Sequence, residues 1–215
     1  MVTNGPRTQA RRTNTPLRRV PVQERSAARV QRMLDACAAL VDELGYDGLT
    51  TTLLAERAGV AIGSIYQFFP DKRAVVQALT MRNLETYLAR IGRRFAAGDL
   101  GHWWEGVDAV IDEYVVMQRD TPGFRGLHFG DIVDVHLLDP ERDNNAVIVG
   151  KLRDLLVEHF AITADASFDF ALTVAVETGD ALIKLAFRRN PAGDQAVIAE
   201  AKSLIRGYLS DYVAN

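Results

Sequence analysis

The residues best suited to polar recognition lie in one short stretch, residues 59–72, which reads GVAIGSIYQFFPDK. Ser64, Tyr66 and Gln67 carry short or flat polar groups that can reach phosphates or base edges in a nucleic-acid groove. Gly63 beside them lets a backbone approach closely. Taken singly, an aromatic residue in such a turn is more often part of a hydrophobic core. The choice between these interpretations depends on the elements that hold the stretch.

The charge of the chain is divided unevenly along its length. Residues 1–94 hold 15 Lys and Arg against 8 Asp and Glu, a net charge of +7, whereas residues 95–215 hold 10 against 20, a net charge of −10. This division is typical of a basic module that meets a polyanion, joined to a body with another task. Residues 1–25 show no periodicity and predict a flexible basic arm, whose Arg18 and Arg19 are candidates for contact with a groove.

Short helices surround the polar stretch. Apolar residues recur every three or four positions from Ser26 to Gly45, which predicts a first helix. The second helix has Thr50 or Thr51 as its N-terminal cap and Gly59 as its end.

The third helix, over about residues 62–69, has only two turns and cannot be stable alone. Ile65, Phe68 or Phe69 can anchor it to the first helix, which leaves its other face free for a groove. Asp71 caps a long fourth helix. Three short helices with a glycine turn between the second and third predict a helix-turn-helix.

Several linked motifs at fixed spacing resemble the N-terminal domain of TetR-type transcriptional regulators over about residues 27–80. The motifs are MLDA at 33–36, GY at 45–46, LTT at 49–51, LAERAGV at 54–60 and GSIYQFFPDK at 63–72. The resemblance implies an all-helical homodimer that binds a palindromic double-stranded DNA operator, usually as a repressor. It also implies that a small molecule enters the C-terminal domain and releases the DNA.

The resemblance further implies roles for individual residues. Thr51 and Thr52 open the second helix near the DNA backbone, and Lys72 contacts phosphate. The recognition helix carries Ser64, Tyr66, Gln67 and Phe68. The family commonly has Ser or Thr as the N-terminal cap of that helix, and this chain has Ala61 instead.

The rest of the chain predicts a helical body, and the fold class is all-α with about nine helices. One helix covers about residues 103–119, and another runs to Phe160 from a start marked by Asp139, Pro140 and Glu141. Two further helices complete the chain. The expected domains are a flexible basic arm at 1–25, a helix-turn-helix DNA-binding domain at 26–73, and a helical effector-binding and dimerisation domain at 74–215.

Aromatic residues and methionine gather around a less regular segment, residues 124–138. An apolar cavity with a few polar groups is the usual form of a small-molecule site, so a small lipophilic effector is expected here. Each residue taken singly is more often plain core, and Glu177 also fits a solvated polar face where Asp180 and Lys184 form an i,i+4 pair. The candidates for ligand binding are Trp104, Tyr114, Met117, Phe124, His128, Phe129, Phe168, Leu172 and Glu177.

The last two helices are apolar around most of their circumference. Such a helix needs partners on two sides, and a second copy of the chain can be one of them. A large monomer core is the alternative. The expected dimer residues are Ala171, Ala175, Thr178, Gly179, Leu182, Val197, Ala201, Leu204 and Tyr208.

Other function classes find less support in the sequence. No run approaches eighteen apolar residues, so a cytoplasmic protein without membrane contact is expected. Motifs such as GxSxG, GxGxxG and CxxC are absent, which disfavours an enzyme or a cofactor, and Cys37 fits an apolar helix face. The segment 128–136 holds two His and two Asp, but on a helix these spread over about 200° and cannot converge on a metal without a break. A metal-responsive regulator and a constitutive silencer without effector remain alternatives.

Overall fold

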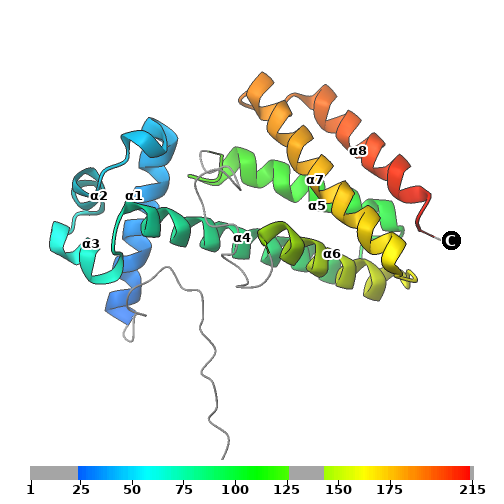
Figure 1. Ribbon diagram of the computed structural model, residues 1–215, viewed down its shortest axis with the longest axis horizontal. Coiled ribbons are helices and arrows are strands. Elements are labelled where there is room, and N and C mark those ends of the chain that lie inside the picture. The colour runs from blue at the N-terminus through cyan, green and yellow to red at the C-terminus, as the bar shows by residue number, and fades with distance from the viewer. Residues whose placement is uncertain (1–23, 126–142, 214–215) are drawn as a thin grey trace, which may run out of the picture.

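The computed structural model describes residues 24–125 and 143–213 (Figure 1). These residues form eight α-helices and no strand, against about nine helices expected, and part of the segment expected to be less regular lies outside the described ranges. Two apolar clusters divide the helices: one contains buried residues between Val30 and Leu79, the other between Leu84 and Val213. The first cluster thus extends beyond the boundary expected at residue 73.

The N-terminal cluster is built by α1 (Glu24–Gly48), α2 (Thr51–Ala58), α3 (Ile62–Phe68) and the start of α4 (Lys72–Ala96). Gly45 interrupts α1 with a φ of 70°, near the expected end of the first helix. The Thr50 hydroxyl caps α2 by accepting from the amide of Leu53 at 3.2 Å. Gly59 ends α2 in the left-handed conformation, which glycine adopts without steric cost.

The C-terminal body consists of α5 (Trp103–Asp120), α6 (Asn144–Phe160), α7 (Ala166–Arg189) and α8 (Gln195–Ser210), together with the later turns of α4. The helices α7 and α8 run side by side as a hairpin along one side of the body (Figure 1). Asp143 caps α6 by accepting from the amide of Ala146 at 2.6 Å. The helix start expected near Asp139 lies outside the described residues.

The helix α4 spans both halves of the molecule (Figure 1). Asp71 caps it by accepting from the amide of Ala74 at 2.9 Å, as expected. Its buried side chains up to Leu79 belong to the N-terminal cluster, and those from Leu84 onward belong to the C-terminal body. The two clusters therefore share one continuous helix.

A second connection joins the end of α5 to α1. Gly123 has a φ of 74°, and a Cβ atom on it would lie 2.8 Å from the Cα of Ala38. Only glycine allows this close approach of the two segments. The amide of Gly123 also donates to the carboxylate of Asp42 at 2.9 Å.

Candidate nucleic-acid interface and effector cavity

The short helix α3 is held on one side only. Ile65 is fully buried and Phe68 is 6 % exposed, so these two side chains attach α3 to the N-terminal cluster. Gly63, Tyr66 and Gln67 are exposed, and Ser64 is half-buried. The structure therefore places the small and polar candidates of α3 on its outward side.

Phe68 was predicted both as an anchor of α3 and, through the family motif, as a DNA-binding residue, and its burial is that of an anchor. Its ring belongs to the apolar cluster between α1 and α3 and presents almost no surface to a groove. On a seven-residue helix, Ile65 and Phe68 are three positions apart and share the inner face. Phe68 thus anchors α3.

Tyr66 is 43 % exposed, and its hydroxyl lies 3.1 Å from the hydroxyl of Thr51 on α2. This hydrogen bond joins the first turn of α2 to α3 and orients the tyrosine ring. Thr52, beside Thr51, is exposed. The outward surface of the helix-turn-helix therefore combines hydroxyl groups from two helices with the amide of Gln67.

The amine of Lys72 donates hydrogen bonds to backbone carbonyls of the N-terminal cluster. It donates to the carbonyls of Tyr46 at 3.3 Å and Leu49 at 3.1 Å, and it lies 4.5 Å from the centre of the Tyr46 ring. These contacts tie the start of α4 to the turn before α2, so contact with phosphate would require Lys72 to leave them. Arg73, the next residue, is exposed at the same end of α4, and the sequence prediction did not include it.

Arg57 on α2 is paired with a carboxylate. Its guanidinium donates to both carboxylate oxygens of Glu43 at 2.7 Å each. These hydrogen bonds, followed by the charge of Arg57, lower the pKa of Glu43 from its ordinary value. Arg18 and Arg19 lie outside the described residues.

A cavity of about 80 Å³ lies inside the C-terminal body. Its wall is contributed by five helices, α4 to α8, and most of its lining is aliphatic. Small residues on α7, Ala175 and Gly179, leave room for it, since longer side chains there would enter the space.

The polar groups of the wall are Tyr87, Tyr114, Asn145 and Asp180. The Tyr114 hydroxyl donates to Asp180 at 2.6 Å, and the Tyr87 hydroxyl donates to the carbonyl of Val110 at 3.1 Å. Burial, followed by the charge of Asp180, raises the pKa of Tyr114 well above its ordinary value. Burial and the nearby carboxylates of Glu113 and Asp180 likewise raise the pKa of Tyr87. Both hydroxyls therefore remain protonated at neutral pH.

Some of the expected ligand residues line the cavity, and others lie elsewhere in the C-terminal body. Tyr114 and Leu172 line the cavity. Met117, Phe124 and Phe168 are at most 2 % exposed and pack in the surrounding core without lining this cavity.

The remaining four candidates, and Asp180 of the expected polar face, lie in different places. Trp104 lines a surface groove of about 550 Å³ between α5 and α8, and Glu177 lines a groove of about 240 Å³ between α6 and α7. Asp180, interpreted from sequence as part of a solvated polar face, lines the cavity and pairs with Lys184 at 2.7 Å. His128 and Phe129 lie outside the described residues.

The residues expected at a dimer interface also separate into two sets. Ala171, Ala175, Gly179 and Ala201 are buried within one chain, so their expected role as interface surface is corrected. A Cβ atom on Gly179 would lie 3.2 Å from Ile205, which shows that the small residues admit α8 onto α7. Leu204 is 47 % exposed, and Thr178, Leu182, Val197 and Tyr208 are half-buried. Phe170, which was not predicted, is 66 % exposed on α7.

Metal and membrane sites find no support in the described part of the chain. Within residues 24–125 and 143–213, no three His, Cys, Asp or Glu side chains are grouped so as to hold a metal ion. The His and Asp segment 128–136 lies outside these ranges. Among the helices of the described residues, none has the length and apolar character needed to cross a membrane.

Two family models match the chain. Residues 33–79 match the model of bacterial regulatory proteins of the tetR family, and residues 101–213 match the C-terminal domain of tetracyclin repressor-like proteins. The crystal structure of a TetR-family transcriptional regulator from Streptomyces coelicolor is similar over 86 % of this chain and 98 % of that chain, with 41 % identity and a TM-score of 0.74.

Curated relatives match over shorter spans. The transcriptional repressor KstR of Mycolicibacterium smegmatis is 35 % identical over 75 residues, which cover 35 % of this chain and 37 % of that protein. A class A tetracycline repressor from Escherichia coli is 47 % identical over 47 residues, 22 % of each chain. The matched segments therefore cover 37 % and 22 % of the length of these two relatives.

Proposed function

Because the chain belongs to the TetR family of bacterial regulatory proteins, we propose that it is a ligand-responsive repressor that binds a palindromic operator as a homodimer. The observation that carries this proposal is the course of α4, which begins beside the outward-facing recognition helix and continues into the wall of the cavity. DNA and a small molecule would thus act on two ends of one helix.

On DNA, the outward side of α3 would enter the major groove. Tyr66 and Gln67 would reach phosphates or base edges, and the Thr51 hydroxyl that holds Tyr66 would keep the ring in position. Arg73 is better placed than Lys72 for contact with phosphate, because the amine of Lys72 is held by two carbonyl oxygens. Arg18 and Arg19 are proposed to add salt-dependent contacts from the basic arm.

The exposed apolar side chains of the α7–α8 hairpin support a dimer. Phe170 on α7 and Leu204 on α8 are both large and exposed, and the half-buried Tyr208 lies one turn beyond Leu204. Burial of these side chains against a second copy would remove apolar surface from water. Two recognition helices would then have to enter successive major grooves about 34 Å apart.

An effector in the cavity would release DNA by favouring a different position of α4. Tyr87 on α4 lines the cavity, so a ligand that displaces this ring moves the helix that carries the recognition helix at its other end. The ligand shifts the population only by the difference between its affinities for the two states.

The test is fluorescence anisotropy with DNA from the region upstream of the gene, at two salt concentrations. We expect tight binding that weakens with salt and that Tyr66→Ala largely removes. Failure to bind any fragment in a genome-wide selection would contradict the proposal. If no compound of a broad lipophilic library releases the protein from its DNA, constitutive silencing would be favoured instead.

A further inference from the structure

The polar side of the cavity offers hydrogen-bond acceptors. The proton of Tyr87 is committed to the carbonyl of Val110, so towards a ligand its hydroxyl oxygen can only accept. The carboxylate of Asp180 accepts one bond from Tyr114 and one contact from Lys184, and a carboxylate has about four acceptor positions. A ligand that binds Tyr87 and Asp180 must therefore supply a donor, whereas the amide of Asn145, which donates to Glu177 at 2.8 Å, can meet either a donor or an acceptor.

The charges at this wall are already balanced. Asp180 is paired with Lys184 at 2.7 Å, and both side chains are 20 % exposed. Among the described residues that line the cavity, Asp180 has the sole charged side chain. An additional buried charge of either sign would thus lack a partner, and an unpaired buried charge is strongly unfavourable.

The size of the cavity limits the ligand further. Its volume is about 80 Å³, whereas a cavity of about 150 Å³ lined by Leu, Ile and Phe accommodates benzene. A single ring is accordingly the largest rigid group that we expect, and it requires small shifts of the wall.

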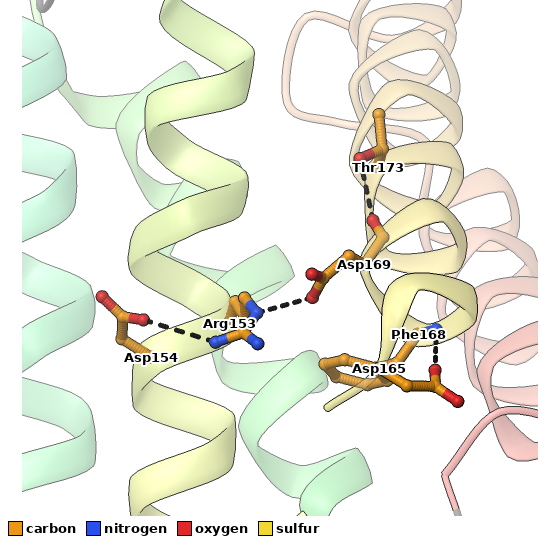
Figure 2. Close-up of polar contacts among 6 residues, drawn as sticks. All are labelled: Arg153, Asp154, Asp165, Phe168, Asp169 and Thr173. Atoms are coloured by element: carbon orange, nitrogen blue, oxygen red, sulfur yellow. Dashed lines mark hydrogen bonds and ion pairs between the residues drawn. The ribbon is translucent and has the colours of Figure 1, made fainter. Parts of the chain in front are cut away.

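The groove between α6 and α7 points to the same ligand class. Asn145 lines both the cavity and this groove, so the two are adjacent. Among the described residues that line it, the groove presents Asp143, Asp169 and Glu177 and one cation, Arg153. Arg153 donates to Asp169 at 2.5 Å (Figure 2). A ligand that approached from this groove would meet an excess of negative charge, which disfavours anions.

We infer that the effector is a neutral molecule of about one ring that donates a hydrogen bond, from a hydroxyl or an uncharged NH group, to Asp180 and Tyr87. This inference rests on the proposed function, since it assumes that the cavity between α4 and α8 is the effector site. The aliphatic wall packs against the ring, and the donor turns towards α4 and α7.

Four compounds of similar size test the inference: 4-fluorophenol, fluorobenzene, 4-fluorobenzoate and 4-fluorobenzylamine. Titration of the full-length protein, followed by fluorine NMR, gives a Kd for each. We expect 4-fluorophenol to bind about tenfold more tightly than fluorobenzene, because a hydrogen bond to a charged group adds that much. The benzoate and the protonated benzylamine should bind at least tenfold more weakly than the phenol.

Two variants test whether the ligand preference arises from Asp180 and from the cavity. Asp180→Asn keeps the shape of the side chain but leaves Lys184 without its carboxylate, so we expect the preference for the phenol to fall and benzoate binding to rise. A general loss of packing would not produce this reversal. Ala175→Leu fills the cavity and should abolish binding of all four compounds, while its circular dichroism spectrum and cooperative thermal unfolding should remain those of a folded protein.

The outcomes separate this inference from the proposed function. Binding of fluorobenzene equal to that of the phenol, or of the benzoate in the wild-type protein, would overturn the inferred ligand class while the cavity remained the binding site. Binding that Ala175→Leu does not affect, or no binding of any compound, would overturn the cavity itself as the effector site, and the inference with it. DNA binding measured in parallel tests the regulator function independently.

Discussion

The amide of Gly123, just after α5, donates to the carboxylate of Asp42 on α1 at 2.9 Å, and so fastens the C-terminal body to the DNA-binding unit. This contact lies beside the continuous helix α4, which joins the same two units. Two connections at different points restrict the rotation of one unit against the other more than a single helix does.

Replacement of Asp42 by Ala should loosen this connection. The Gly123 amide would lose its acceptor in a buried position, at a cost of about 1–2 kcal/mol in the free energy of unfolding. Urea unfolding measures the cost, and hydrogen exchange should show a faster Gly123 amide. Asp47→Ala, at an exposed carboxylate of the same unit, is the control and should change neither measurement.

Tyr66→Ala should weaken operator binding by about 1–3 kcal/mol, the usual contribution of a residue that reaches base edges. Tyr66→Phe keeps the ring and removes the contact with Thr51, so it should lose only part of that binding energy. Anisotropy titrations measure both affinities. Thr86→Ala, exposed on α4, serves as the control. Full affinity of Tyr66→Ala would argue against α3 as the recognition helix.

Phe68→Ala should act through stability, because its ring is part of the core. We expect a loss of about 3–5 kcal/mol in the free energy of unfolding, the usual cost of removing a buried Phe side chain. Leu44→Ala, at a 49 % exposed position of the same unit, should stay within about 0.5 kcal/mol of wild type. A well-folded Phe68→Ala protein that fails to bind DNA would restore the sequence-based prediction of a direct contact.

Leu204→Asp should weaken the proposed dimer. A carboxylate at this 47 % exposed apolar position would be buried without a partner in a two-fold interface of α7 and α8. Analytical ultracentrifugation at micromolar protein should show monomers for this variant and dimers for wild type. Ser203→Asp adds the same charge at the neighbouring exposed position, which lines the groove on another side of α8, and should remain dimeric.

Cys37 should make the protein less stable in alkali. Burial raises the pKa of its thiol to about 12, whereas in the unfolded chain the value is near 9. Above about pH 9 the unfolded state loses this proton first, so the folded state loses stability by up to about 1.4 kcal/mol per pH unit until pH 12. Urea unfolding at pH 7 to 10 should show this slope in wild type and its reduction in Cys37→Ala. Equal slopes would contradict the prediction.

The local signals in the sequence identified most helix ends. Thr50 and Asp71 cap α2 and α4 with their side chains, and Gly59 ends α2, because these contacts involve neighbours within a few residues. The inward side of α3 was likewise apparent, since Ile65 must attach so short a helix. The prediction that Phe68 contacts DNA came from position in a family motif, which does not state on which side of a helix a ring lies.

Contacts between distant segments could not be predicted in the same way. The amine of Lys72 meets the carbonyls of Tyr46 and Leu49 only after folding brings residues 23 or more positions apart together. Ala175 and Gly179 fit a close approach of two helices, but the pattern does not say whether the second helix belongs to the same chain. In the structure it is α8 of the same chain, and the two residues also border the cavity.

The sequence by itself determined the all-helical class, the helix-turn-helix and the basic and acidic halves, because periodicity, caps and charge are properties of neighbouring residues. The tertiary structure alone decided that Tyr114 and Asp180, 66 positions apart, meet at a cavity wall, and that Phe124 and Phe168 pack outside it. Whether a buried side chain borders a cavity depends on how five helices pack together, and no single helix pattern contains that information.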